Sequence, residues 1–347
     1  MSPVVEAFVE GVIKAAIALG FLLNSFAIMT IMERKVVGRM QQRYGPNRVG
    51  PFGLLQPLAD GVKLLMKEQI IPARVNVPIY IVAPTISVMV SLMAFAVIPV
   101  APAFTAGPYR VGWWISNPNI GILYLFAVAS LGVYGIVLGS WSSGNKYSLL
   151  GGLRSTAQII SYELAFGLSI VSAILLAGSL NLPEVVKVQS HLPWFILIQP
   201  LGFAIFAIGG IAETNRAPFD LPEAEQELIA GYHTEYSGFR FALYFMAEYI
   251  NMVTISALAT TLFLGGWLPI NFGWFPGWLQ WLDNFLLWVP GVLWFLAKVS
   301  FFLFAYMWLR ATLPRIRYDR LMWFGWKVLL PLAVLNVLIT ALYVSLQ

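Results

Sequence analysis

Four ionisable side chains fall inside or at the edge of long apolar segments of this chain, where a charge needs a reason: Glu163, Glu213, Glu248 and Lys298. A charge at the centre of a membrane helix costs at least ~2.5–3.5 kcal/mol, so such residues face a bundle interior or a hydrated cavity. Burial brings the pKa of a carboxyl group toward neutrality, so a series of buried acids could pass protons. The alternative is a set of interhelical ion pairs, for example between a Glu and Lys298 or Arg154.

The stretch from Glu213 to Tyr236 is the most unusual in the chain, because acids alternate there with large apolar residues. It holds six of the sixteen acids: Glu213, Asp220, Glu223, Glu225, Glu227 and Glu235. Pro218 and Pro222 keep it irregular or break it into short helices. A solvated acidic loop does not need the apolar residues between the acids: Phe219, Leu221, Leu228, Ile229, Tyr232 and Tyr236. We therefore expect a folded loop, packed against the protein or a partner, with partly desolvated acids.

The residue types argue against a redox centre on this chain. It has no Cys, which excludes thiolate-bound Fe–S clusters and disulfides. Its two histidines, His191 and His233, fall in predicted loops, so we expect no metal site and no catalytic Ser/His/Asp set. Gly151-Gly152 lacks the preceding strand of a phosphate-binding loop, and we expect no NADH site here. If the protein takes part in redox chemistry, the redox centres belong to other chains.

Membrane-spanning helices must position these residues. The 347-residue chain is 59% hydrophobic and only 11% charged, whereas soluble domains have about 25% charged residues. A bilayer core requires a helix of ~20 apolar residues. Eight segments meet this requirement: 7–32, 79–101, 119–140, 157–178, 193–212, 239–264, 285–309 and 325–346. No repeat and no linker divides them, so we predict an all-α integral membrane protein with one transmembrane domain, residues 1–347.

Basic residues concentrate in the odd-numbered connections between these spans. Those connections carry sixteen of the 21 Lys and Arg residues, and the even-numbered ones carry only Arg110 and Lys187. The positive-inside rule then places the odd connections in the cytoplasm and both termini outside. The net charge of +5 is therefore interpreted as a sign of topology and not of nucleic-acid binding.

The first connection contains a predicted amphipathic helix after Pro57. Its apolar residues recur at helical spacing: Leu58, Val62, Leu65 and Met66. Asp60, Lys63 and Lys67 take the opposite face, a pattern typical of a helix on the membrane surface. Such a helix is either an ordinary interfacial anchor or a wall of a site for a lipid-soluble substrate.

Three long blocks of sequence point to one family. The first begins with Glu33-Arg34-Lys35 and continues through Gly-Pro-Asn-Arg-Val-Gly-Pro-Phe-Gly-Leu-Leu-Gln-Pro-Leu-Ala-Asp-Gly-Val-Lys at 45–63. The second, 213–236, has the core Ala-Pro-Phe-Asp-Leu-Pro-Glu-Ala-Glu, and the third is 310–321. In order, spacing and number of spans, nearly the whole chain resembles the H subunit of bacterial NADH–quinone oxidoreductase (respiratory complex I), the counterpart of the first mitochondrially encoded subunit.

This resemblance implies a tunnel that admits quinone, either ubiquinone or menaquinone, from the bilayer of the bacterial inner membrane. The head group would be reduced against a peripheral subunit, and the Fe–S clusters, FMN and NADH would be held by partner subunits. The implied tunnel residues are Arg34, Asp60, Lys63, Phe219, Asp220, Glu223 and Glu225. The candidate proton relay, leading to adjacent small membrane subunits of the pumping arm, is formed by Glu163, Glu213, Glu227, Glu235, Glu248 and Lys298.

One departure from the family and two other functional classes bear on this interpretation. Some relatives carry a carboxylate in the third span where this chain has Ser130-Leu131; if that acid relays protons in them, the route here must differ or use water. An independent transporter would suit the buried acids but often shows inverted repeats, which we do not see. A purely structural anchor would explain the basic connections but not Glu163 and Glu248. Membrane-bound hydrogenases contain similar subunits, although the quinone-type blocks favour complex I.

Overall fold

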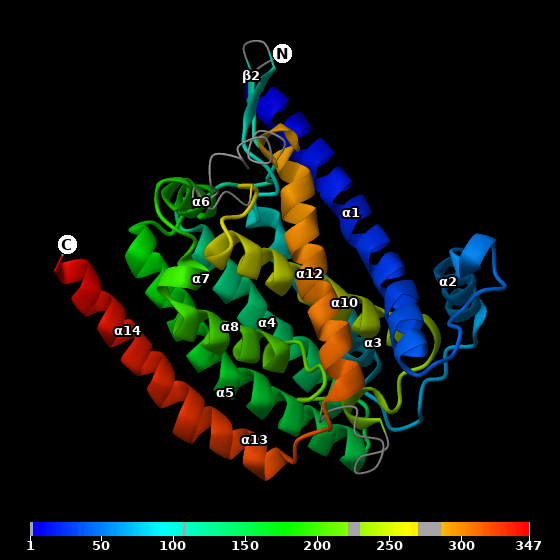
Figure 1. The fold of residues 1–347 in the computed structure, drawn as a ribbon. Helices are drawn as coiled ribbons and strands as arrows, with labels where there is room; N and C mark the ends of the chain where they lie inside the picture. The colour runs from blue at the N-terminus through cyan, green and yellow to red at the C-terminus, as the bar shows by residue number, and fades with distance from the viewer. Residues whose placement is uncertain (1–2, 107–108, 221–229, 270–285, 347) are drawn as a thin grey trace.

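The computed structural model describes residues 3–106, 109–220, 230–269 and 286–346. Within these residues, seven helical segments are long and apolar enough to cross a membrane (Figure 1). They are α1 (Pro3–Met40), α3 (Val77–Ala94), α4 (Gly121–Ser142), α5 (Lys146–Ala177), α10 (Gly238–Phe263), α12 (Gly291–Thr312) and the continuous segment Tyr318–Ser345. The prediction of an all-α membrane protein is confirmed.

The last of these segments changes helix type along its length. It consists of α13 (Tyr318–Phe324), a π-helical turn η5 (Gly325–Leu329) and α14 (Leu330–Ser345). The Tyr162 ring packs closely on Gly325, where a Cβ would come within 3.1 Å of it. The Tyr162 hydroxyl also donates to the carbonyl of Leu321 at 3.0 Å. The glycine therefore lets α5 approach this segment closely.

The fifth predicted span, 193–212, is a broken helix. One turn, α7 (Phe195–Ile198), is followed by α8 (Pro200–Glu213), which is apolar but only 14 residues long. The break falls at Gln199 because Pro200 has no N–H and disfavours helical geometry in the residue before it. The Gln199 amide lies in the bundle and donates to the Thr340 hydroxyl at 2.7 Å. The eight predicted spans thus correspond to seven long helical segments and one interrupted one.

Helices α5 and α10 lie at the centre of the arrangement. α5 contacts α4, α8 and α14, and α10 contacts α1, α3 and α12. The aromatic rings of Phe166, Phe206 and Phe263 join α5, α8 and α10, with centroid distances of 4.8 and 5.2 Å. In Figure 1, α1 and α12 form one edge of the bundle and α14 forms the opposite edge.

Short elements fill the connections. They are η1 (Pro51–Gly53), α2 (Gln56–Met66), η2 (Phe95–Val97), β1 (Phe104–Ala106), β2 (Tyr109–Val111), α6 (Leu182–His191) and η3 (Gly231–His233). β1 and β2 pair as an antiparallel ribbon that the sequence analysis did not predict. The two histidines lie in short helices and not in loops, α6 being capped by the Asn181 side chain.

Three helical segments extend well beyond the predicted spans because polar residues do not end them, and the last of these begins at Tyr318 instead of residue 325. α1 continues from the predicted end at residue 32 to Met40, since Glu33 and Arg34 line a cavity and Lys35 donates to the Phe52 carbonyl. α5 begins at Lys146, where the Asn145 side chain caps its first turn by accepting from the Tyr147 N–H at 2.9 Å. The amphipathic helix α2 is present as predicted and stands beside α1 (Figure 1).

Candidate functional site

A buried ion cluster brings together residues from four distant segments. Glu33 comes from α1, Arg216 from the loop after α8, Glu248 from α10 and Arg310 from the end of α12. The Arg216 guanidinium contacts Glu33 at 3.3 Å and also contacts Glu248, while Arg310 pairs with Glu33. The Tyr249 hydroxyl donates to Glu33, and the Tyr249 ring centroid lies 4.4 Å from the Arg216 guanidinium carbon.

Arg216 is suited to this position by its shape and by its constant charge. Removing a cation from water costs several kcal/mol, which only well-placed partners offset. A planar guanidinium can meet two carboxylates and an aromatic face at once, whereas an ammonium cannot. Burial, at 4% exposure, opposes the charge, but Glu248, Tyr249 and Glu33 hold the pKa of Arg216 above its ordinary value. Arg216 is therefore a fixed positive charge between the two acids of the cluster.

A large cavity of about 1060 Å³ lies between α1, α2 and α10 and reaches the cluster at Glu33, Tyr249 and Arg310. Its other lining is mixed. Apolar side chains of α10 contribute one wall, including Phe245 and Met246. A cavity of this size that combines apolar walls with polar groups can hold a small organic ligand.

Three predicted tunnel residues line this cavity on the side of α2. They are Arg34, Asp60 and Lys63. Arg34 pairs with Asp60 at 2.7 Å, and Lys63 lies 3.8 Å from the same carboxylate. Partial burial opposes ionisation of Asp60, but the hydrogen bonds from Arg34 and Gln56 hold the pKa of that carboxyl below its usual value. The cavity wall at α2 is therefore charged, and ion pairs connect its side chains.

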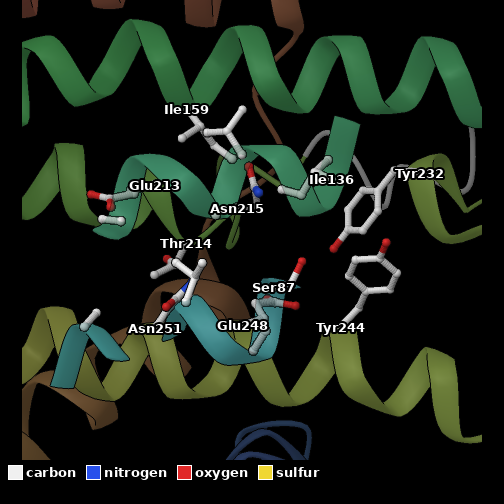
Figure 2. A pocket seen from close by; sticks show the side chains of 16 residues that line it. Ser87, Ile136, Ile159, Glu213, Thr214, Asn215, Tyr232, Tyr244, Glu248 and Asn251 are labelled. Atoms are coloured by element: carbon white, nitrogen blue, oxygen red, sulfur yellow. The ribbon is translucent and has the colours of Figure 1, made fainter. Parts of the chain in front are cut away.

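A second cavity, of about 80 Å³, lies among α3, α4, α5 and α10 (Figure 2). Its polar lining includes Ser87, Glu213, Thr214, Asn215, Tyr232, Tyr244, Glu248 and Asn251. Figure 2 shows Glu213 at one end and the rings of Tyr232 and Tyr244 at the other. This space is enough for a few water molecules, which such polar groups can hold. Since Glu248 lines this cavity and Glu33 lines the larger one, Arg216 contacts one carboxylate from each.

Glu163 extends the series of acids toward the side of the bundle. Its charge is close enough to interact with that of Glu213, and the Ser130 hydroxyl donates to its carboxylate. Glu163 is half-buried and Ser130 is exposed, so this acid lies nearer a lateral face than the predicted interior position. The departure noted at Ser130-Leu131 is thus in direct contact with a candidate relay residue.

Lys298 lies at a different place from the acids. Its ammonium donates to the carbonyls of Leu264, Gly266 and Leu268 at 2.6, 3.0 and 2.7 Å. It also lies 4.4 Å from the ring of Trp194. These carbonyls follow the C-terminus of α10, where backbone carbonyls have no N–H partner within the helix. No salt bridge in the described part of the chain involves Lys298, and its relay role stays a prediction.

The described parts of the acidic loop are folded against the bundle. Phe219 packs on Tyr162 with ring centroids 5.5 Å apart, and Asp220 pairs with Arg315 at 3.2 Å. Neither Phe219 nor Asp220 is among the described residues that line the large cavity. Glu223, Glu225 and Glu227 lie outside the described residues.

Two amides hold this loop in place. The buried Gln158 side chain donates to the carbonyls of Ala212 and Phe219 at 3.0 and 2.9 Å. At the far end of the loop, the Asn145 amide donates to the Glu235 carboxylate at 2.6 Å. Glu235 therefore lies near the start of α5.

Comparison with known proteins shows the family of this chain. A family model described as NADH dehydrogenase matches residues 13–341. The H subunit of NADH-quinone oxidoreductase from Thermomicrobium roseum is 52% identical over 335 residues, which cover 94% of this chain and 93% of the relative. NADH-quinone oxidoreductase subunit 8 of Thermus thermophilus is 50% identical over 336 residues, which cover 96% and 87%. The chain belongs to the H-subunit family of NADH-quinone oxidoreductase.

As a member of this family, the chain is a multi-pass membrane subunit of an enzyme complex that contains other subunits. This membership decides between the classes left open by the sequence and sets aside an independent transporter. The three sequence blocks that carried the resemblance also have a structural meaning. Glu33, Arg216 and Arg310 come one from each block and meet in the ion cluster.

The sequence analysis singled out Glu248 but not its partners. The predicted first span ended before Glu33, and no role was predicted for Arg216. The expected structural alternative for a buried Glu was a pair with Lys298 or Arg154, whereas Glu248 contacts Arg216. A usable signal was present, because each of the three blocks places a charged residue at the end of an apolar segment.

Proposed function

We propose that this chain forms much of the tunnel through which quinone reaches its reduction site, and that it couples quinone reduction to proton translocation. One observation carries the proposal: Arg216 contacts Glu33 in the large cavity and Glu248 in the small one. Through this guanidinium, a change of charge in the large cavity acts on the acids of the small one.

The large cavity suits quinone by its chemistry. A quinone has a polar head group and an isoprenoid tail, and the cavity combines Arg34 and Asp60 with the apolar wall of α10. The apolar residues Leu58, Leu65 and Met66 of α2 are exposed, which favours contact of this helix with the membrane surface. Reduction to quinol takes two electrons and two protons, and the electrons come from Fe–S clusters of partner subunits.

The coupling step follows from electrostatics. A unit charge ~4 Å away changes the energy of a buried group by ~4 kcal/mol at an effective dielectric constant of ~20. That energy corresponds to a change of about a thousandfold in a protonation equilibrium. A change in charge beside Glu33 and Arg310 alters how strongly Arg216 attracts Glu248. Glu248 and Glu213 then gain or release protons, and Glu163 connects them to the lateral face.

The orientation and the partners complete the proposal. Basic residues in the odd-numbered connections place those connections on the cytoplasmic side of the bacterial inner membrane and both termini outside. Peripheral subunits that hold the Fe–S clusters, FMN and the NADH site then cover the side that carries α2. Small membrane subunits of the pumping arm meet the face at Ser130 and Glu163. Asp220, Glu223, Glu225, Glu227 and Glu235 of the acidic loop respond to the state of the quinone.

The tunnel is tested by filling it at Gly61. This residue lines the large cavity, and a Cβ built on it meets nothing within 4 Å. Gly61→Trp should therefore fold and obstruct the cavity, raising the KM for a long-tailed quinone about tenfold, the effect of losing roughly 1.4 kcal/mol of binding. Gly20→Trp is the matched control, since Gly20 also has open space around it but does not line the described cavity.

The assay uses purified complex containing each variant. NADH oxidation is followed with quinone and with a water-soluble acceptor that bypasses the quinone site. Equal KM values for quinone in the two variants would refute the tunnel.

Coupling is tested by Glu248→Gln, which keeps the size of the side chain and removes its charge. We expect assembled complex with impaired proton pumping in proteoliposomes. Unchanged quinone reduction and unchanged pumping would refute the coupling role of this acid.

A further inference from the structure

The small cavity is connected to the protein surface by a chain of hydroxyl groups. Tyr244 lines the cavity, and its hydroxyl donates to the Gly135 carbonyl at 3.1 Å. The ring of Tyr244 lies 5.0 Å from that of Tyr236, and both hydroxyls face Gly139, whose Cβ would lie within 3.2 Å of each of them. The Tyr236 and Ser143 hydroxyls lie beside each other because both donate to the same carbonyl, that of Gly139. Ser143 lines an open hollow of about 470 Å³ on the surface, together with Lys146 and Glu235. The order is therefore hollow, Ser143, Tyr236, Tyr244, cavity.

Helix α4 makes room for this chain at Gly139. The Gly139 carbonyl accepts from Ser143 at 2.7 Å and from Tyr236 at 3.4 Å. A Cβ at this position would overlap the Tyr244 hydroxyl and lie 3.2 Å from that of Tyr236. The absence of a side chain at Gly139 therefore allows the two hydroxyls to meet.

The two tyrosine rings are buried and packed against other aromatic rings. Tyr236 and Tyr244 are both buried, and the ring of Tyr236 stacks on that of Tyr80 with centroids 4.2 Å apart. The Tyr232 ring packs edge-on against Tyr244 at 5.2 Å. Burial raises the pKa of Tyr236, so its hydroxyl stays neutral. A neutral hydroxyl can accept one proton while it donates another.

We propose that Ser143, Tyr236 and Tyr244 form a proton inlet that refills the acids of the small cavity from the hollow. The proposal rests on the coupling role proposed above. Water in the hollow gives a proton to Ser143, which passes its own proton to Tyr236, and Tyr236 passes its own to Tyr244. Tyr244 passes a proton across the hydrated cavity to the Glu248 carboxylate. Each hydroxyl ends neutral and rotates back before the next transfer.

The geometry of the hollow agrees with this role. It is lined by segments from three odd-numbered connections, around Arg74, Lys146 and Glu235. These connections lie on the side predicted to be cytoplasmic, from which a pump of this orientation takes up protons. At the opposite end of the cavity, Glu213 leads toward Glu163 and the lateral face. The proton inlet at Tyr244 and the acid Glu213, which leads outward, therefore lie at opposite ends of one cavity (Figure 2).

The test removes single hydroxyls from the complete enzyme complex. Tyr244→Phe and Tyr236→Phe keep the aromatic packing and interrupt the chain. Tyr80→Phe is the matched control: Tyr80 stacks on Tyr236, but its hydroxyl donates to the Glu235 backbone carbonyl at 2.7 Å and is not in the chain. Glu248→Gln is measured alongside, and pumping and quinone reduction are followed in proteoliposomes.

We expect proton pumping to fall at least about tenfold in Tyr244→Phe and in Tyr236→Phe, as for loss of a positioned proton donor. Tyr80→Phe should pump like the unmodified complex. If both chain variants pump as well as Tyr80→Phe while Glu248→Gln does not, the inlet is refuted and the coupling role stands. If Glu248→Gln also pumps normally, the coupling role itself fails.

Discussion

Replacing Arg216 by lysine is the sharpest test of how the two cavities communicate. Arg216→Lys keeps the positive charge in the buried cluster, so Glu33 and Glu248 do not lose a counter-charge. It removes the planar fork that contacts both carboxylates. A single ammonium can form a good ion pair with only one of the two carboxylates. The electrostatic coupling between the cavities is then weaker, although the positive charge is still present.

The size of the effect follows from the contacts. Deleting the charge would cost ~3–5 kcal/mol, because a buried partner would be left uncompensated. Keeping the charge but losing one hydrogen bond to a charged group costs ~1.5–3 kcal/mol. This is about a 10- to 100-fold change in the equilibrium that links the two acids. We expect Arg216→Lys to assemble, to reduce quinone and to pump fewer protons for each quinone reduced.

The assay compares pumping with quinone reduction in proteoliposomes. Arg317→Lys is the control, because Arg317 pairs with Asp319 at 3.1 Å on the surface, where both side chains are more than 70% exposed. Such a surface pair contributes ~0–1 kcal/mol. If the ratio of protons to quinone in Arg216→Lys equals that of Arg317→Lys, Arg216 does not transmit charge between the cavities.

Further predictions concern the ends of the site. The low pKa of Asp60 means that its pair with Arg34 is complete above the usual pKa of about 4 and is lost only at lower pH. Asp60→Asn should therefore change the quinone KM by the same factor from about pH 6 to pH 8, and a factor that varies over this range would contradict the assignment. Lys298→Met leaves three carbonyls without their donor and should destabilise the protein by ~3 kcal/mol or more, measured by thermal unfolding; lost pumping in the surviving complex would support its predicted relay role. Glu163→Gln should impair pumping with assembly intact and Ser130→Ala should do so less, since Ser130 gives Glu163 a single hydrogen bond; normal pumping in Glu163→Gln would remove it from the route.

Hydropathy predicted most of the membrane helices because each long apolar run has to satisfy its own backbone in lipid. The same criterion misplaced the end of α1, since it treats the charges at 33–35 as a stop. In the folded protein those charges meet partners and the helix continues to Met40. It also missed the break at Gln199, where a single proline interrupts a segment whose mean hydropathy is unaffected.

In the candidate site, too, some residues could be predicted from the sequence and others only from the fold. Buried acids such as Glu163 and Glu248 stand out in a sequence because a charge among apolar residues is rare. Their partners do not, because a contact between Glu33 and Arg216 joins residues 183 positions apart, which no local pattern reports. The hydroxyl chain was equally hidden, since serines and tyrosines are common near membrane interfaces and only the fold aligns them.

Arg216 also sets a limit on where protons can travel. A proton moving directly from the large cavity to the small one has to pass a permanent positive charge. Arg216 is held protonated between Glu33 and Glu248, so its guanidinium cannot accept a proton from one cavity and release it to the other. The acids of each cavity then respond to the charge in the other cavity, while protons do not pass directly between the two. Under the coupling proposed above, the protons consumed in making quinol and the protons moved across the membrane would be drawn from separate pools.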